Sequence, residues 1–203
     1  MKKLIAIIVL AAGASRRFGT SNKLLVRIEG EPLAVRTVRL TGAVQVAGAE
    51  LETYVVVRGT GVTDALAGAG LTPRTIDSPR AADGMGHSIA AGVASLGPDV
   101  DGALVIPADM PLLSVEFVAC LLTAFVAAGA QRPAHPLLPD GTRSGPVVWP
   151  RPMFQALMAL EGDRGGKGLL DGIATVAVAS PGEGVLADMD TQADYQRLVE
   201  SGR

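Results

Sequence analysis

Two uninterrupted aliphatic runs constrain the fold of this chain more than any other feature. Residues 4–10 read Leu-Ile-Ala-Ile-Ile-Val-Leu, and residues 102–106 read Gly-Ala-Leu-Val-Ile. A strand that lacks alternating polar residues is buried on both faces, as in a parallel sheet covered by helices. Aromatic residues, which β-sandwiches use more heavily, make up only 3% of the chain. Both features favour an α/β fold.

The remaining patterns alternate between strand and helix. Further strands are predicted at residues 53–57, 75–76, 146–149 and 175–178, and helices at 32–46, 63–69, 86–96, 114–128, 153–160 and 192–200. Such alternation produces right-handed βαβ units. We therefore predict a single domain over residues 1–203, a Rossmann-like three-layer sandwich with a mostly parallel sheet.

A proline-rich stretch interrupts this alternation. Residues 131–152 contain six prolines, with Gly141 and Gly145 between them. Proline cannot donate a ladder hydrogen bond and is tolerated at sheet edges. We therefore expect a loop-rich insertion at about residues 131–168, whose short strands lie at the edge of the sheet.

Charge and composition exclude several classes of partner. The chain has 18 basic and 20 acidic residues and few aromatic side chains, so we expect no nucleic-acid partner. The apolar run 117–130 is too short to span a bilayer, and we expect a cytoplasmic protein with no membrane partner. The only cysteine, Cys120, lies within that run and is expected to be a buried structural thiol.

A glycine-containing loop follows the first predicted strand. Residues 10–19 read Leu-Ala-Ala-Gly-Ala-Ser-Arg-Arg-Phe-Gly, and Lys23 comes four residues later. Small residues let the backbone approach a phosphate, while Arg16 and Lys23 supply positive charge. The dinucleotide motif G-x-G-x-x-G fails because position 15 is Ser15, and a Walker A loop fails on its spacing. A βα turn with no ligand is the alternative.

Two acidic positions lie next to predicted elements, one after a strand and one before a helix. Asp109 lies just beyond the strand 102–106 and Asp190 precedes the last helix. Ligands of an open α/β sheet gather at the carboxyl ends of its strands, and Mg²⁺ uses one or two carboxylates together with phosphates. Asp109 is therefore a candidate metal ligand. The alternatives are that Asp109 closes a turn and that Asp190 or Thr191 caps the helix.

Glycines also precede the predicted helix 86–96. A helix N-terminus offers free N–H groups that favour nucleotide or phosphate, and Ser88 is the candidate contact there; an ordinary first-turn serine is the alternative. His87 is expected to be an ordinary exposed loop residue. It cannot form a zinc site with the distant His135, because further ligands are lacking.

The loop 10–19 with Lys23 resembles the signature L-A-x-G-x-S-x-R-[FM]-G-x-x-K of the MobA/MocA-like nucleotidyltransferase family. These enzymes couple a nucleoside triphosphate to the phosphate of molybdopterin. The resemblance covers nearly the whole chain and implies a nucleotide-diphospho-sugar transferase-like sheet. It also implies a nucleotide-binding set of Leu10, Ala11, Ala12, Gly13, Ser15, Arg16, Lys23, Ser88 and Asp109, with Lys23, Arg16 and Asp109 catalytic.

The same resemblance extends to the metal and to the later loops. The segment 188–191 is similar to the family's D-[IM]-D-T, which implies that Asp190 completes a Mg²⁺ site with Asp109, with Asp188 a weaker candidate. Carboxylates of this kind also accept Mn²⁺. Residues 143–149 and 162–165 resemble the acceptor-side R-G-[HN]-P-V-[LV]-[FW] strand and G-D-x-G loop, although Ser144-Gly145 lacks the family's polar side chain.

The resemblance implies transfer of CMP from CTP to molybdopterin. Ala12 stands where the guanylyl-transferring branch has Gly, which points to CTP, and the expected partner is a molybdoenzyme or its maturation chaperone. A guanylyltransferase, and a cytidylyltransferase acting on methylerythritol phosphate, share the expected fold and metal site. An NAD(P)-dependent oxidoreductase and a non-catalytic nucleotide-binding chaperone are further alternatives. The failed dinucleotide motif weighs against the first, and the pair of acids against the second.

Overall fold

The computed structural model describes every residue except 1, 14–17, 19–21, 181, 183 and 201–203. Its strands are β1 (Lys3–Ala11), β2 (Arg27–Ile28), β3 (Glu31–Pro32), β4 (Ala49–Val57), β5 (Arg74–Asp77), β6 (Gly102–Pro107), β7 (Ala134–Leu137), β8 (Val147–Pro150) and β9 (Val176–Ala179). Its α-helices are α1 (Leu33–Ala43), α2 (Gly61–Gly68), α3 (Met85–Ala94), α4 (Val115–Ala127), α5 (Phe154–Met158) and α6 (Gln192–Glu200). Short 3-10 helices are η1 (Lys23–Leu25), η2 (Pro79–Asp83), η3 (Arg151–Met153) and η4 (Gly166–Leu170).

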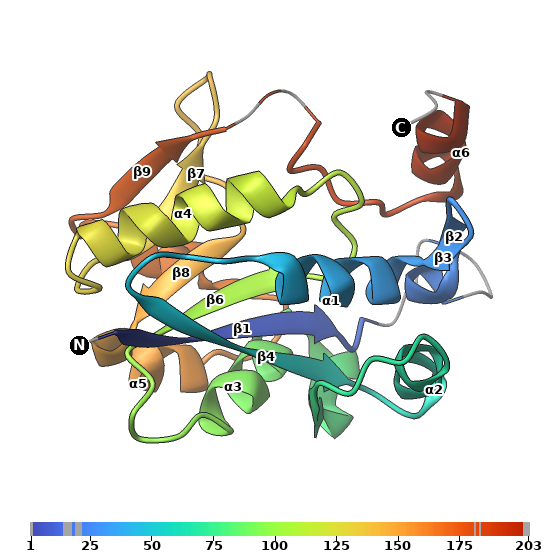
Figure 1. The fold of residues 1–203 in the computed structure, drawn as a ribbon, viewed down its shortest axis with the longest axis horizontal. Coiled ribbons are helices and arrows are strands. Elements are labelled where there is room, and N and C mark those ends of the chain that lie inside the picture. Colours follow the sequence, from blue (N-terminus) through green and yellow to red (C-terminus); the bar gives the residue numbers. More distant parts are fainter. Residues whose placement is uncertain (1, 14–17, 19–21, 181, 183, 201–203) are drawn as a thin grey trace.

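Seven strands form the central sheet, in the order β5-β4-β1-β6-β8-β7-β9. The pairs β5–β4, β4–β1, β1–β6 and β7–β9 are parallel, whereas β8 is antiparallel to both β6 and β7. Within this sheet β8 alone therefore runs in the opposite direction. The predicted mostly parallel α/β sheet is confirmed (Figure 1).

The expectation that the proline-rich stretch forms edge strands is wrong. β8 lies between β6 and β7, and all four of its residues are buried. The prolines do not prevent this position, because the β7–β8 ladder pairs only Ala134 with Val148, and Pro150 is the last residue of its strand. The edge of the sheet on this side is β9.

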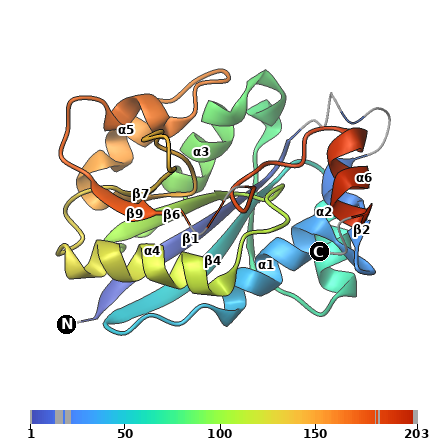
Figure 2. The same cartoon turned by 90° about the horizontal axis from the view of Figure 1, so that it is seen from above.

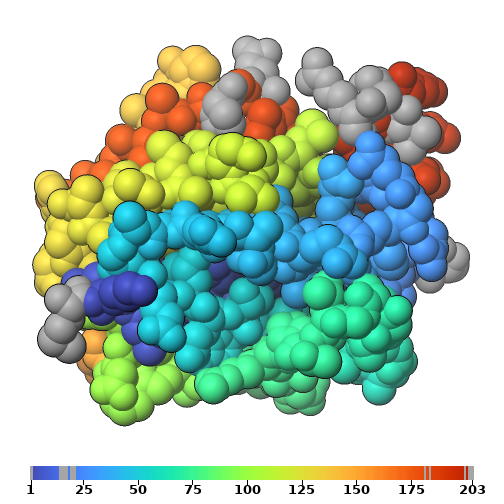
Figure 3. Space-filling model, in the orientation of Figure 1, coloured from blue at the N-terminus to red at the C-terminus, as the bar shows by residue number. Residues whose placement is uncertain are grey.

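Hydrophobic cores lie on both faces of the sheet. Alternate residues of β1 pack into different clusters, Ile5 and Ile7 with residues of α1 and α4, and Ala6 and Ile8 with residues of α3 and α5. Figure 2 shows the two helical layers on opposite sides of the sheet, and in Figure 3 the side chains of α1 and α4 lie across the middle of the face turned to the viewer. The strand predicted to be buried on both faces is thus confirmed.

Helix α4 contradicts the prediction for Cys120. The helix begins as expected, because Ser114 accepts a hydrogen bond from the backbone N–H of Phe117 (3.2 Å). Its buried positions are Phe117, Val118, Leu121, Leu122 and Phe125. Cys120 lies off this stripe and is exposed. Burial in a helix follows the 3.6-residue periodicity of its faces. Because nearly all residues around Cys120 are apolar, the sequence does not show which face is buried.

None of the helices within the described part of the chain is long and apolar enough to cross a bilayer.

A carboxylate far from the carboxyl ends of the strands anchors the start of β1. Asp101 accepts hydrogen bonds from the ammonium of Lys3 and the backbone N–H of Leu4, each 2.9 Å long. Partial burial opposes ionisation of Asp101, but these two donors outweigh it and lower its pKa. A depressed carboxyl pKa stabilises the fold above the unfolded-state pKa and ceases to do so as the pH falls through the folded-state value.

We therefore expect Asp101→Asn to lower the free energy of unfolding at neutral pH by ~0.5–1 kcal/mol, a range reduced for the partial exposure of the ion pair. The difference between variant and wild type should shrink as the pH falls below about 4, where the carboxyl of the unfolded chain becomes protonated, and should vanish once the carboxyl of the folded protein is protonated as well. Urea unfolding at several pH values measures this. A difference that does not depend on pH would contradict the role of the charge.

Candidate active site

The carboxyl ends of β1 and β6 lie side by side. Leu10 and Pro107 are partners in the parallel register, and the N–H of Ala108 donates to the carbonyl of Leu10 (3.1 Å). Asp109 therefore leaves the sheet next to the loop that begins after β1. Within that loop Ala12 is 3% exposed, whereas Gly13 is exposed. This edge is where the sequence predicts a ligand.

Contacts from two other elements fix the backbone around Asp109. The hydroxyl of Thr37, a buried residue of α1, lies 3.1 Å from the carbonyl of Ala108. The N–H of Met189 donates to the carbonyl of Asp109 (2.8 Å). Met189 is 2% exposed and belongs to a small core with Phe18, Ile28, Leu33 and Leu198. The segment that carries Asp188 and Asp190 is thereby held beside Asp109.

A reciprocal cap fixes the other end of this segment, at the start of α6. One carboxylate oxygen of Asp194 accepts hydrogen bonds from the N–H of Asp190 (3.1 Å) and from the N–H and hydroxyl of Thr191 (both 2.8 Å). In return the N–H of Asp194 donates to the Thr191 hydroxyl (3.2 Å). Hydrogen bonds from Thr191 lower the pKa of Asp194. Because Thr191 caps the helix, the carboxylate of Asp190 is left to face the site.

We expect Asp194→Ala to destabilise the fold by ~1–2 kcal/mol, because the variant leaves several N–H groups at the helix start without acceptors. The backbone of Asp190 would no longer be held by Asp194, and this loss of positioning should also reduce the rate of nucleotidyl transfer. Thermal unfolding and pyrophosphate release measure the two effects. Arg197→Gln is the matched control: it removes the exposed ion pair with Asp194 and a long, exposed hydrogen bond to the carbonyl of Ala193, and should change neither quantity appreciably.

Lys23 joins the two predicted metal ligands. It lies in η1, whose preceding residue Asn22 accepts a hydrogen bond from the N–H of Leu24 (3.0 Å). Lys23 is only 8% exposed, and its ammonium lies 2.5 Å from Asp109 Oδ2 and 2.7 Å from Asp190 Oδ1. Burial acts to lower the pKa of Lys23, but the two carboxylates outweigh it and raise the pKa. The side chain is therefore a buried cation held by two acids.

The second oxygen of Asp109 is a buried acceptor that lacks a hydrogen-bond partner among the described residues. An unsatisfied buried carboxylate oxygen is costly and points to a missing cation or donor. No group of three or more His, Cys, Asp or Glu in the described part of the chain is arranged as a metal cluster. Mg²⁺, however, needs only one or two carboxylates when phosphates and water complete its shell. Asp109 and Asp190 fit that requirement.

Asp188 adds a third carboxylate to the same region. Although the residue reaches solvent, partial burial raises its pKa to about 6, with further contributions from the negative charges of Asp109 and Asp190. The positive charges of Lys23 and Lys167 act in the opposite direction. Sequence reasoning missed Lys167, whose only signal was its position just after the G-D-x-G loop. The carboxylates of this region would attract a cation, and the two lysines would offset the negative charge of an incoming phosphate.

The start of α3 differs from the sequence-based expectation. The N–H of Gly86 donates to the carbonyl of Gly162 (2.8 Å), so this N–H is not free for a phosphate. Ser88 is 5% exposed and lies on the side of the helix that packs against the sheet. His87 lies in the first turn of α3, not in a loop, and His135 is buried between Pro136 and Thr175.

The structure thus brings together part of the predicted site. Lys23, Asp109 and Asp190 are in direct contact, next to the loop that begins at Leu10. Ser15 and Arg16 lie outside the described residues.

Comparisons with known proteins reveal solved structures with the same fold. Rv0371c from Mycobacterium tuberculosis H37Rv is 24% identical to this chain, with 98% of this chain and 100% of that one covered and a TM-score of 0.77. A homologue of Rv0371c from Mycobacterium sp. strain JC1 is 25% identical, with 97% and 96% covered and a TM-score of 0.76. No curated protein matches the chain in sequence.

Two similar structures contain ligands. A complex of Rv0371c with manganese is 20% identical, with 98% of this chain and 100% of that one covered and a TM-score of 0.74. CMP:2-keto-3-deoxy-manno-octonic acid synthetase complexed with CTP is 17% identical, with 99% and 98% covered and a TM-score of 0.73. At these identities the likeness concerns the fold.

The family itself follows from the sequence match. The family model of the MobA-like NTP transferase domain matches residues 7–179, which include the carboxyl-terminal part of the first aliphatic strand, the whole of the second, Lys23 and Asp109. The chain therefore belongs to the MobA-like family of nucleotidyltransferases.

Proposed function

We propose that this protein transfers CMP from CTP to the terminal phosphate of molybdopterin and releases pyrophosphate. The observation that carries the proposal is the contact of Lys23 with both Asp109 and Asp190 at the carboxyl edge of β1 and β6. A lysine and two aspartates at this edge suit a substrate that carries phosphates and arrives with a divalent metal. The lysine can bind the phosphates and the aspartates the metal.

Asp109 and Asp190 are the residues that would hold Mg²⁺ or Mn²⁺. The orphaned oxygen of Asp109 supports this assignment, as does the manganese complex of the similar protein Rv0371c. When bound, such a cation neutralises phosphate charge and polarises the phosphorus–oxygen bonds.

The chain's own residues bind the triphosphate and balance its charge. Oxygen of the acceptor phosphate attacks the α-phosphorus of CTP, a new P–O bond forms, and the bond to the β-phosphate breaks. Lys23 would move from its carboxylate partners to the phosphates and offset charge on the leaving pyrophosphate. Arg16 and Ser15 are proposed to contact the same phosphates, with Leu10, Ala11, Ala12 and Gly13 beside the ribose and base and Ser88 as a further contact.

The choice of CTP depends on one position in the first loop. Ala12 stands where the guanylyl-transferring branch of the family has Gly, and its side chain is buried. A methyl group here would narrow the space available to a base, which favours the smaller pyrimidine. The CTP complex of a similarly folded synthetase supports the same choice.

The acceptor-side residues also allow a phosphate acceptor other than molybdopterin. Ser144-Gly145 departs from the family's acceptor-side pattern, and this observation favours a second candidate, a cytidylyltransferase acting on a different phosphate. A molybdoenzyme or its maturation chaperone would receive the product if molybdopterin is the acceptor.

Pyrophosphate release tests the proposal. Purified protein with Mg²⁺ and molybdopterin is offered CTP or GTP in parallel. We expect release with CTP at a rate at least tenfold above that with GTP, since one misfitted group in a pocket costs about 1–3 kcal/mol. Faster turnover of GTP would overturn the nucleotide assignment. Tight CTP binding without turnover on molybdopterin, but with turnover on methylerythritol phosphate, would overturn the acceptor assignment.

A further inference from the structure

The start of α3 and the segment 161–166 approach each other backbone to backbone. A Cβ atom on Gly84 would lie 2.0 Å from the carbonyl carbon of Gly162, and one on Gly86 would lie 2.9 Å from the backbone nitrogen of Glu161. Gly84 also has φ +134°, which disfavours any other residue. Both glycines are therefore required by a close contact between α3 and this segment.

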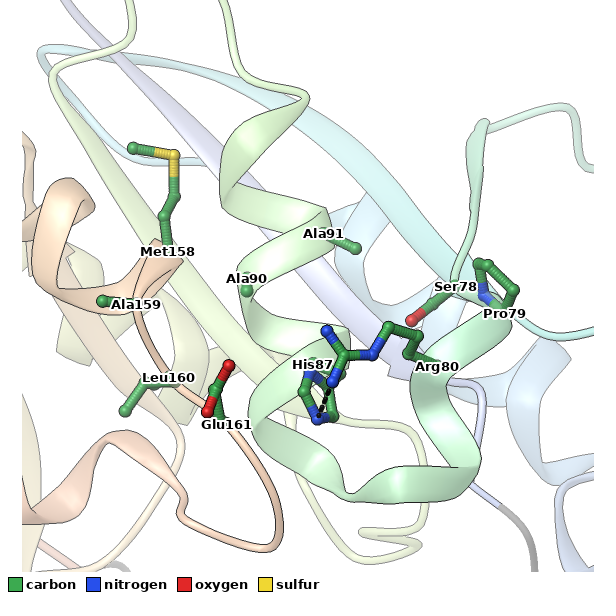
Figure 4. A pocket seen from close by; sticks show the side chains of 10 residues that line it. All are labelled: Ser78, Pro79, Arg80, His87, Ala90, Ala91, Met158, Ala159, Leu160 and Glu161. Atoms are coloured by element: carbon green, nitrogen blue, oxygen red, sulfur yellow. Dashed lines mark hydrogen bonds between the residues drawn. The ribbon is translucent and has the colours of Figure 1, made fainter.

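Hydrogen bonds also join α3 to the segment 161–166. The N–H of Gly86 donates to the carbonyl of Gly162 (2.8 Å), and the N–H of Gly162 donates to Nε2 of His87 (3.3 Å). The guanidinium of Arg80 approaches the same nitrogen at 3.4 Å, as Figure 4 shows. Two donors facing Nε2 assign the lone pair to this nitrogen and the proton of the neutral ring to Nδ1.

A shallow cavity of about 300 Å³ lies over this junction, and its walls come from η2, α3 and the segment that follows α5. In Figure 4 the side chains of His87 and Arg80 meet on one side of the cavity, and Glu161 lies across from them. His87 is half-buried there. Its ring thus links α3 to the segment 161–166. The residues that line this cavity do not include Lys23, Asp109 or Asp190.

The chain that follows this segment is held as well. The guanidinium of Arg143 donates to the carbonyl of Leu170 (3.0 Å) and lies 3.2 Å from Asp171 Oδ1. Between the two anchors lies η4, in which Lys167 is exposed. Lys167 therefore presents an exposed ammonium on a stretch of backbone that is held at both ends.

We propose that His87 is a positioning residue, which docks the segment 161–166 on α3 and thereby holds the exposed Lys167, the next residue, in place to receive the phosphate of the acceptor. The docking rests on the contacts alone, whereas the role toward the acceptor rests on the proposed function. His87 itself touches no substrate. Its imidazole supplies the acceptor for the N–H of Gly162.

The test compares His87→Leu, which removes the acceptor nitrogen, with His87→Gln, whose amide oxygen can replace it. Hydrogen exchange of the segment 161–170 should be about fivefold faster in His87→Leu and near the wild-type rate in His87→Gln, as expected for one hydrogen bond. The KM for molybdopterin should rise about tenfold in His87→Leu, with the KM for CTP within twofold of wild type. A merely structural defect would alter both KM values.

Lys167→Gln separates the two halves of the proposal: it should raise the KM for molybdopterin without faster exchange of the segment. Unchanged exchange in His87→Leu would overturn the docking, and faster exchange with an unchanged acceptor KM would overturn the positioning role. If wild-type protein does not react with molybdopterin at all, the proposed function and the acceptor role fail together, and the exchange rates still decide the docking.

Discussion

Asp109→Asn is expected to lower kcat/KM for nucleotidyl transfer about 10³-fold, a loss of roughly 4 kcal/mol of transition-state stabilisation. The amide keeps the size of the side chain and removes its charge, so the orphaned oxygen can no longer help to bind a divalent cation. The fold should persist, because Lys23 retains its contact with Asp190. Pyrophosphate release and the melting temperature measure the two outcomes.

Asp101→Asn provides the matched control for Asp109→Asn. Asp101 immediately precedes β6 and Asp109 follows its other end, so the two substitutions remove the same charge at opposite edges of the sheet. We expect kcat/KM of Asp101→Asn to stay within about twofold of wild type, because surface charges this far away are screened. If Asp109→Asn keeps more than a tenth of wild-type activity, Asp109 is not the principal metal ligand.

The sequence alone predicts the fold and the edge at which the carboxylates lie. Aliphatic runs without polar alternation leave few architectures open, since such strands must be covered on both faces. The carboxyl ends of parallel strands meet at one edge of the sheet. The sequence alone therefore predicts that Asp109 and the loop after Leu10 lie at this edge. Asp190 was added by resemblance, and the structure brings it to Lys23.

Contacts between distant segments could not be predicted from composition or periodicity. Nothing local indicates that Lys23 reaches Asp190, 167 residues later, or that His87 accepts a hydrogen bond from Gly162. The position of β8 inside the sheet depends on its pairing with β6, whereas its prolines suggested an edge. Cys120 shows the same limit on a smaller scale, because a helix with so few polar residues does not reveal which side faces the core.

Lys23→Met is expected to have opposite effects on the two ligands of the site. The ammonium of Lys23 contacts both Asp109 and Asp190, so a divalent cation must compete with it for the negative charge of the same two carboxylates. Removing the ammonium takes one positive charge away from these carboxylates, which then attract a cation more strongly. We expect the affinity for Mn²⁺ without nucleotide to rise at least tenfold. Activity should fall by about 10²–10³-fold, because the triphosphate loses its buried counter-charge.

Mn²⁺ titration followed by calorimetry or electron paramagnetic resonance measures the first effect, with pyrophosphate release for the second. Lys23→Arg keeps the charge, so its Mn²⁺ affinity should stay near wild type even if the longer fork impairs catalysis. If Lys23→Met binds Mn²⁺ no more tightly than wild type, the ammonium and the metal do not compete for these carboxylates. If they do compete, the metal alone binds the wild type weakly and gains affinity once the triphosphate draws Lys23 away. Binding of the metal and binding of the triphosphate are then coupled.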